Sequence, residues 1–395
     1  MSPSAAPRAN FNFPTAYRIG AGRAATDLAP ACRDFGFSRP LVVTDPGVRG
    51  LAWFDPLLAK LSGAGLEPGV WSDCGANPTE AHVASAMAAY KAGKHDGIVL
   101  LGGGSAMDVG KCVALLADNP GTVFDYEDVG DNYKRADPNK IVRTIAIPTT
   151  AGTGSEVGRC SVITDTSDHA KKIIFHARMQ PALVIADPEL LLGLSPRLTA
   201  ATGTDALAHC FEAYCVPSYH PMADGIALEG MRLIKEWLPV AHRDGANLAA
   251  RTHMLMASSM GATAFQKGLG LVHAWSHPLG GVTGLHHGTA NAIFLPYVMV
   301  ENRAEIDAKM QHLARYLDLP KPGFDGVLAW MTSLIAELGL PSKLDGVAGV
   351  TRAMGKELAP MAERDPSLGS NPKPCSLGDL QRVFEKTFDG DLTPS

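Results

Sequence analysis

Short apolar runs alternate with amphipathic segments in the first half of the chain. Runs rich in β-branched residues, which are typical of buried strands in a parallel sheet, stand at residues 40–45, 95–104, 141–150 and 181–187. Between the first two runs, residues 78–94 have a helical pattern that begins with a proline and a glutamate suited to a first helical turn. This order of strand, helix and strand predicts an α/β fold in which helices cover a largely parallel sheet.

The pattern changes near residue 193. Helical periodicity dominates from there on, in the segments 193–214, 226–243 and 247–265, with few β-branched runs between them. A chain of 395 residues is also too long for one simple core. We therefore predict an α/β domain over residues 1–192 and an all-helical domain over residues 193–395.

Composition and charge favour small-molecule chemistry. The net charge is −5 with acidic and basic residues interspersed, which gives no basic footprint for nucleic acid. No apolar run approaches the ~20 residues of a membrane helix, and the N-terminus lacks the apolar region of a signal peptide. The 7 cysteines are odd in number and lack CxxC spacing, which is typical of reduced thiols. We expect a cytoplasmic protein without nucleic-acid or membrane partners.

A glycine-rich loop, GGGSAMDVGKCVALLA at residues 102–117, follows the second strand and runs into an apolar-periodic helix. Bare glycines let the backbone approach a phosphate closely, and a helix N-terminus offers unpaired N–H groups and the positive end of the helix dipole. The loop matches neither the GxGxxG dinucleotide fingerprint nor a P-loop. The alternative is a tight strand-to-helix turn without a ligand.

Two further strand ends carry candidate cofactor residues. Asp45 ends the first strand, where a carboxylate can accept hydrogen bonds from adenosine ribose hydroxyls and would repel a 2′-phosphate, which favours NAD over NADP. Alternatively, Asp45 only caps the turn that begins at Pro46. The sequence PTTAGTGSE at residues 148–156 is a polar, glycine-rich turn whose hydroxyls and amides could line the nicotinamide ribose.

Histidines and an aspartate recur at helical spacing in the second half of the chain. Asp205 and His209 are spaced i, i+4 and so project from one helix face, and His273 and His277 repeat that spacing on a second helix. Each stands among small or apolar neighbours, where an unpaired polar group would be costly. A shared metal ion removes that cost for several side chains at once, although a lone helical histidine is more often structural.

The chain after this second helix can supply one more ligand. We expect Pro278 and the pair Gly280–Gly281 to end the helix, and the chain then returns with His286 and His287, either of which could be the ligand. Two helices and a returning loop would thus place three imidazoles and one carboxylate around one point. That set suits Fe(II), Zn(II) or a similar divalent ion and leaves room for a substrate oxygen.

Four motifs together resemble the iron-dependent (group III) alcohol dehydrogenase family. They are GGGSAMDVGK, PTTAGTGSE, TDALAHCFEAY and GLGLVHAWSHPLGG…HHGTANAIFLPYVM, in the family's order, and the likeness covers nearly the whole chain. The resemblance implies the two-domain fold shared with dehydroquinate synthase, with an NAD(P)-binding α/β domain, a helical metal-binding domain and the active site in the cleft between them. It further implies reversible hydride transfer between a small alcohol and NAD, one divalent metal, with Fe(II) the first candidate, and a homodimer or larger homo-oligomer.

Position by position, the resemblance implies metal ligands, cofactor contacts and a proton relay. The ligands would be Asp205, His209, His273 and His287, the last because it directly precedes the glycine of the family's HG motif. His277 matches a histidine that is not a ligand but stands near the nicotinamide, where it could relay a proton between the substrate oxygen and solvent. The cofactor residues carried over are Asp45, Asn77, Gly103, Gly104, Ser105, Asp108, Thr149, Thr150 and Lys171.

Three positions depart from the family pattern. His286 replaces the proline often seen before the last ligand, Lys267 stands where many relatives carry a small or apolar residue, and Arg159 follows the PTTAGTGSE turn. The last two fall near the expected substrate pocket, where they could hold the carboxylate of an ω-oxo acid such as succinic semialdehyde. The alternative is that both side chains point to solvent or form structural pairs.

Two related enzyme classes are alternatives. Dehydroquinate synthase is a lyase that also binds NAD and a metal, but its anionic substrate calls for a cluster of lysines and arginines, of which residues 205–300 hold few. A metal-free reductase like the maleylacetate reductases would have altered ligand positions, whereas all four are present here. Both alternatives therefore rank below the dehydrogenase.

Overall fold

The computed structural model describes residues 9–12, 15–168 and 170–394. The chain divides into two compact units. Among the described residues, the α/β unit comprises residues 15–168, 170–202 and 240–259, and the helical unit comprises residues 9–12, 203–239 and 260–394. The long helices that contribute residues to both units are α6 (Pro196–Cys215), α7 (Pro221–Arg243) and α8 (Leu248–Ala264).

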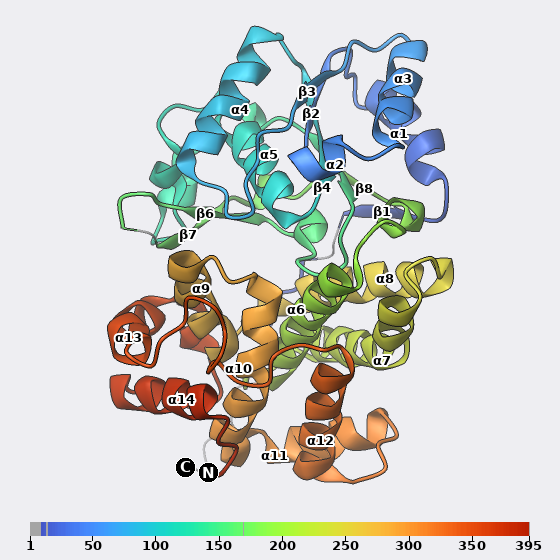
Figure 1. Ribbon diagram of the computed structural model, residues 1–395. Helices are drawn as coiled ribbons and strands as arrows, with labels where there is room; N and C mark the ends of the chain where they lie inside the picture. The colour runs from blue at the N-terminus through green and yellow to red at the C-terminus, as the bar shows by residue number, and fades with distance from the viewer. Residues whose placement is uncertain (1–8, 13–14, 169, 395) are drawn as a thin grey trace, which may run out of the picture. The chain divides into compact units, whose positions relative to one another are not determined.

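A parallel six-stranded sheet forms the centre of the α/β unit (Figure 1). Its strands, in order across the sheet, are β1 (Ala16–Ile19), β8 (Leu183–Ala186), β5 (Thr144–Pro148), β4 (Gly97–Gly102), β2 (Pro40–Val43) and β3 (Gly69–Trp71). The four middle strands are the predicted apolar runs, and every residue in them is buried. This is the burial that a sheet covered on both faces requires, and the predicted α/β fold class is confirmed.

Helices cover both faces of this sheet. On one side lie α1 (Arg23–Asp34) and α3 (Phe54–Gly63), and on the other lie α4 (Glu80–Ala92) and α5 (Gly104–Leu116) (Figure 1). The side follows from the right-handedness of parallel crossovers: the connections through α1 and α3 run toward β3, whereas those through α4 and α5 run back toward β1. The direction reverses between the neighbouring strands β2 and β4. Their carboxyl ends therefore form the switch point at which such sheets bind ligands.

An antiparallel hairpin adds a feature that the apolar pattern did not predict. Its strands are β6 (Cys160–Thr164) and β7 (Lys171–Phe175). The remaining short elements of the unit are α2 (Pro46–Arg49), η1 (Val123–Tyr126), η2 (Asn132–Arg135), η3 (Pro138–Lys140), η4 (Ser155–Val157), η5 (Ala177–Met179) and η6 (Pro188–Leu191).

The helical unit is built around buried aromatic rings. Trp275 stacks on Phe294 with ring centroids 5.9 Å apart and meets Phe384 at 5.0 Å, and all three rings are buried. The elements that follow α8 are η7 (Phe265–Lys267), α9 (Leu271–Thr283), α10 (His287–Glu301), α11 (Arg303–Tyr316), α12 (Gly323–Glu337), α13 (Met354–Arg364), η8 (Pro366–Ser370) and α14 (Leu377–Asp389). None of the described helices has both the length and the apolar character needed to cross a membrane.

The prediction that α9 ends at Pro278 and Gly280–Gly281 is wrong. The helix continues through Pro278 and the two glycines and ends at Thr283, before Gly284 in the left-handed conformation with φ 72°. The N–H of Gly284 donates to the carbonyl of Gly280 and so closes the last turn. Pro278 removes one backbone hydrogen bond, but Pro278, Leu279 and Gly280 are all buried in the unit, and this packing outweighs the local preference.

Candidate metal and cofactor sites

Four side chains converge in the helical unit. Asp205 and His209 come from α6, His273 comes from α9, and His287 is the first residue of α10. Each offers one ligand atom, and these four atoms all lie within 4.8 Å of one another. Asp205 Oδ1 lies 3.6 Å from His209 Nε2, 3.9 Å from His273 Nε2 and 3.5 Å from His287 Nε2. Of the two adjacent histidines left open by spacing, this group contains His287, whereas His286 precedes α10 with an exposed side chain.

The donor chemistry of this group fits a divalent transition metal. The side chains of Asp205, His209 and His273 are at most 5% exposed, and that of His287 is 26% exposed. A buried carboxylate facing three imidazoles is costly without a cation to share their lone pairs. Three nitrogen donors and one oxygen donor are the set that iron and zinc sites use.

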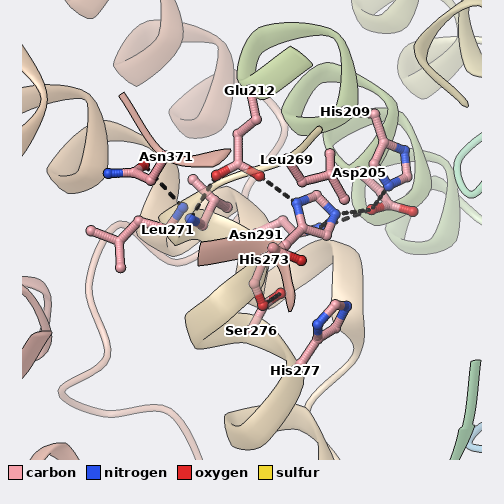
Figure 2. A network of polar contacts seen from close by, with 12 residues as sticks. Asp205, His209, Glu212, Leu269, Leu271, His273, Ser276, His277, Asn291 and Asn371 are labelled. Carbon is pink, nitrogen blue, oxygen red and sulfur yellow. Dashed lines mark hydrogen bonds and ion pairs between the residues drawn. The ribbon is translucent and has the colours of Figure 1, made fainter. Parts of the chain in front are cut away.

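Glu212 orients His273 and was not predicted from the sequence. It lies seven residues after Asp205 on α6, and its Oε2 is 2.6 Å from His273 Nδ1 (Figure 2). Its Oε1 accepts from the backbone N–H of Val272 in the first turn of α9. With Nδ1 held, His273 presents Nε2 to Asp205. Burial alone would lower the pKa of His273, but the hydrogen bond and charge of Glu212, with the charges of Asp205 and Asp365, raise it. The same negative charges favour a bound cation.

Asn291 is a second residue that sequence reasoning missed. It follows His287 by one helical turn on α10. Its Nδ2 donates to Asp205 Oδ1 at 2.8 Å and lies 3.3 Å from His273 Nε2 and 3.2 Å from His287 Nε2. Its buried Oδ1 has no hydrogen-bond partner among the described residues. The carboxamide therefore contacts three of the four donor atoms. In the sequence, only its i, i+4 spacing from His287 could have pointed to this residue.

His277 stands beside the group, one turn after His273 on α9 (Figure 2). Its ring stacks on that of His287 with centroids 5.3 Å apart and an interplanar angle of 11°. Its Nδ1 lies 2.7 Å from Asp365 Oδ2. Burial works to raise the pKa of Asp365, but the charge and hydrogen bond of His277 and the N–H of Ser367 outweigh it and lower that pKa. The ring of His277 is thus fixed by a buried carboxylate.

The glycine loop in the α/β unit begins α5 at the switch point. Gly103 precedes the helix and Gly104 is its first residue. A Cβ on Gly103 would lie 3.3 Å from Thr150 Oγ1, and a Cβ on Gly104 would lie 2.7 Å from Thr153 Oγ1. The loop therefore packs against the turn that follows β5, and a side chain at position 104 would collide with it. Ser105 Oγ donates to the carbonyl of Ala76.

Two other predicted cofactor residues lie at the same strand ends. Asp45 Oδ1 accepts from the N–H of Val48 and so caps α2, while its Oδ2 faces Gly102 at the end of β4. Capping, the alternative left open by the sequence, thus coexists with a position at the switch point. Thr149 is buried directly after β5, and its N–H donates to the carbonyl of Gly102.

The carboxylate of Asp108 bonds to other groups of the protein. Its buried carboxylate accepts from Ser155 Oγ at 2.6 Å and from the N–H of Val162 at 2.9 Å, and it lies 3.2 Å from Lys111 Nζ. These bonds tie α5 to η4 and β6. The two remaining predicted cofactor residues are half-buried, Asn77 before α4 and Lys171 at the start of β7.

The two cations considered for a substrate carboxylate have different surroundings. The side chain of Lys267 is completely buried, and its Nζ lies 2.5 Å from Asp224 Oδ1. Its charge is therefore matched by a structural ion pair, which was the alternative reading of this residue. Arg159 is half-buried before β6, with its guanidinium 5.6 Å from the ring centroid of Phe175.

Known proteins resemble this chain along nearly its whole length. The family model for iron-containing alcohol dehydrogenase matches residues 14–188, and the model for the C-terminal part of that family matches residues 199–388. The 4-hydroxybutyrate dehydrogenase of Cupriavidus necator is 40% identical over 371 residues, which are 91% of this chain and 95% of that protein.

Solved structures of the same family also resemble this chain. A 1,3-propanediol oxidoreductase is 32% identical with a TM-score of 0.89, covering 96% of this chain and 99% of that one. The sulfoacetaldehyde reductase of Bifidobacterium kashiwanohense, solved with NAD+, is 28% identical with a TM-score of 0.86, covering 96% of this chain and 98% of that one. The chain therefore belongs to the iron-containing alcohol dehydrogenase family and is a metal-dependent, NAD-linked oxidoreductase that interconverts alcohols and aldehydes.

Proposed function

We propose that Asp205, His209, His273 and His287 hold one divalent metal ion, with Fe(II) as the first candidate and Zn(II) as the second. The convergence of their four ligand atoms within 4.8 Å carries this proposal. When bound, such a cation supplies Lewis-acid polarisation of a substrate hydroxyl or carbonyl oxygen. The intact set of four favours this chemistry over that of a metal-free reductase of the maleylacetate type.

His277 is proposed to move the proton. Asp365 holds Nδ1, so Nε2 is left to accept a proton from a substrate hydroxyl or to return it to a carbonyl oxygen. The side chain is 13% exposed, which allows exchange of that proton with solvent. Stacking on His287 fixes the plane of the ring, so that Nε2 keeps one direction during the transfer.

NAD(H) is the proposed dinucleotide, in preference to NADP(H). Gly103, Gly104 and Ser105 begin α5 at the switch point, where bare backbone and unpaired N–H groups favour a pyrophosphate. Asp108 is proposed to support this loop from within. The residues proposed to line the rest of the cofactor are Asp45, Asn77, Thr149, Thr150 and Lys171.

Replacing Asp45 by serine is expected to relax the discrimination against NADPH by about tenfold, or roughly 1.4 kcal/mol, because a carboxylate that would repel the 2′-phosphate is removed. Serine keeps an oxygen that can cap α2, so the fold should be unaffected. The ratio of kcat/KM for NADH and NADPH measures the effect. An unchanged ratio would refute the proposed role of Asp45 in cofactor choice.

The proposed substrate is a small ω-hydroxy acid or its semialdehyde. The relative with 40% identity is named a 4-hydroxybutyrate dehydrogenase, which supports a substrate with a carboxylate. Lys267 is left out of this proposal because Asp224 matches its charge. Arg159 is retained as the candidate partner of the carboxylate.

The test is NADH oxidation by metal-free protein reconstituted anaerobically with Fe(II), with Zn(II) or with no metal. We expect turnover only with metal, and a higher kcat/KM for succinic semialdehyde than for butanal, the neutral aldehyde of equal length. Turnover without metal would refute the proposed metal site. Equal values for the two aldehydes would remove the carboxylate from the substrate proposal while leaving the dehydrogenase intact.

We also propose a cytoplasmic location, a homo-oligomeric state and a domain boundary. Reduced thiols agree with a cytoplasmic location, and no two cysteines of the described residues form a disulfide. A homodimer or larger homo-oligomer is proposed from the family resemblance. The domain boundary between residues 192 and 193, which falls between η6 and α6, stays a prediction.

A further inference from the structure

Glu156 closes the turn that follows β5. It lies in η4, three residues after Thr153, and is 2% exposed. No ion pair between described residues includes it. The positive charge that acts on it is that of Lys111 of α5, whose Nζ is bound to Ser155 Oγ and lies 3.2 Å from Asp108. A carboxyl group is therefore buried in the α/β unit without a cation of its own.

Glu156 is joined to two other elements through one serine hydroxyl. Ser259 Oγ of α8 lies 2.6 Å from Glu156 Oε1, 2.9 Å from Tyr17 Oη of β1 and 3.2 Å from the carbonyl oxygen of Leu255. At least three oxygen-to-oxygen contacts thus meet at Ser259. All of these residues belong to the α/β unit.

The number of protons in this cluster indicates the state of Glu156. Tyr17 and Ser259 have one hydroxyl proton each, which can serve only two of the three contacts. A proton on Glu156 supplies the third: Tyr17 and Glu156 then donate to Ser259, and Ser259 donates to the carbonyl of Leu255. Burial also raises the pKa of Glu156, and this outweighs the hydrogen bonds of Ser259 and of the Glu156 backbone N–H and the positive charge of Lys111, which lower it.

We propose that Glu156 is a positioning residue for the cofactor turn, and that it acts as an uncharged hydrogen-bond donor to Ser259. The turn at residues 148–156 carries Thr150 and Thr153, whose side chains lie against Gly103 and Gly104. Its far end is anchored by Glu156 to β1 and α8, so loss of the anchor would let the threonines move relative to the glycine loop. This inference rests on the proposed cofactor role of that loop and turn.

The test is the dissociation constant of NADH, measured by fluorescence titration of purified, metal-loaded protein. Ser259→Ala and Glu156→Leu should each weaken NADH binding by about tenfold or more. Glu156→Gln should stay within about threefold of the unmodified protein, because its carboxamide N–H can donate where the carboxylic O–H did. Ser258→Ala is the matched control: it removes a buried hydroxyl from the next position of α8, and that hydroxyl has no hydrogen-bond partner among the described residues.

The outcomes distinguish failure of the proposed role of Glu156 from failure of the proposed cofactor site. NADH binding by Ser259→Ala equal to that of Ser258→Ala would overturn the anchor. A loss in Glu156→Gln as large as in Glu156→Leu would overturn the uncharged state. Failure of the unmodified protein to bind NADH would instead refute the proposed cofactor site, since it involves no change at Glu156.

The pH dependence of stability gives a second readout, which separates an uncharged donor from a carboxylate. A group whose pKa is raised in the folded state contributes stability that is present below its ordinary value of 4.5 and is lost as the pH rises through the folded value. Tyr17 of β1, Lys111 of α5 and Ser259 of α8 are the groups that act on Glu156, and Glu156→Gln leaves all three in place. The melting temperature of the unmodified protein should therefore fall relative to Glu156→Gln as the pH rises above 4.5. A constant difference would contradict the proposal.

Discussion

His273→Ala is expected to lose nearly all bound metal and to reduce turnover by a factor on the order of 10³ or more. The variant removes one of four donor atoms and leaves the buried Oε2 of Glu212 without its imidazole partner, while Oε1 keeps the backbone N–H of Val272. Loss of a Lewis acid worth several kcal/mol to the transition state corresponds to at least this factor in rate. NADH binding should be retained, because the proposed cofactor residues lie in the α/β unit.

Metal content by elemental analysis and turnover on the same sample measure the effect. His286→Ala is the matched control, since it removes an adjacent, exposed histidine that is not in the group of four. Glu212→Gln should fall between them, with metal affinity lowered by about 10- to 100-fold, because the orientation of His273 would be less well held. Normal metal content and turnover in His273→Ala would refute the metal site.

Gly104→Ala is expected to weaken NADH binding by about a hundredfold, or roughly 2.7 kcal/mol, while metal content stays normal. A methyl group at this position would lie 2.7 Å from Thr153 Oγ1, so either the turn or the start of α5 must shift. The same group would also occupy space beside the helix N-terminus where a phosphate is proposed to approach.

Two further variants give this prediction its controls. Gly225→Ala makes the same change inside α7, where an added Cβ meets nothing within 4 Å, and it should bind NADH normally. Gly104→Ala combined with Thr153→Ala removes the two closest colliding atoms and should recover part of the affinity. Unimpaired NADH binding by Gly104→Ala alone would show that the glycine loop does not hold the cofactor.

Local patterns in the sequence were sufficient for the fold class and for most of the candidate metal group. The apolar runs predicted the four middle strands because a strand buried on both faces must be apolar at nearly every position. Asp205 and His209 share a helix face because their spacing matches the helical period. The choice between His286 and His287 could not be made from spacing, since adjacent residues serve a returning loop equally well.

Partners distant in the sequence could not be inferred from such patterns. Glu212 and His273 are 61 residues apart, and His277 and Asp365 are 88 residues apart, so only the packing of their helices and loops brings each pair into hydrogen-bond distance. The same holds for Lys267, which pairs with Asp224 although its charge in the sequence was compatible with a substrate carboxylate.

Tertiary packing outweighed the local backbone preference of the chain in α9. Pro278 predicts a helix end, but α9 continues because the residues after it are buried. Strand order was likewise outside the reach of the sequence, since apolar periodicity shows that a strand is buried and not which strand lies beside it. Residue types and spacings thus determined the elements and the chemistry available to this protein. Only the tertiary structure decided which groups meet, because contacts between distant segments depend on how the whole chain excludes water from its core.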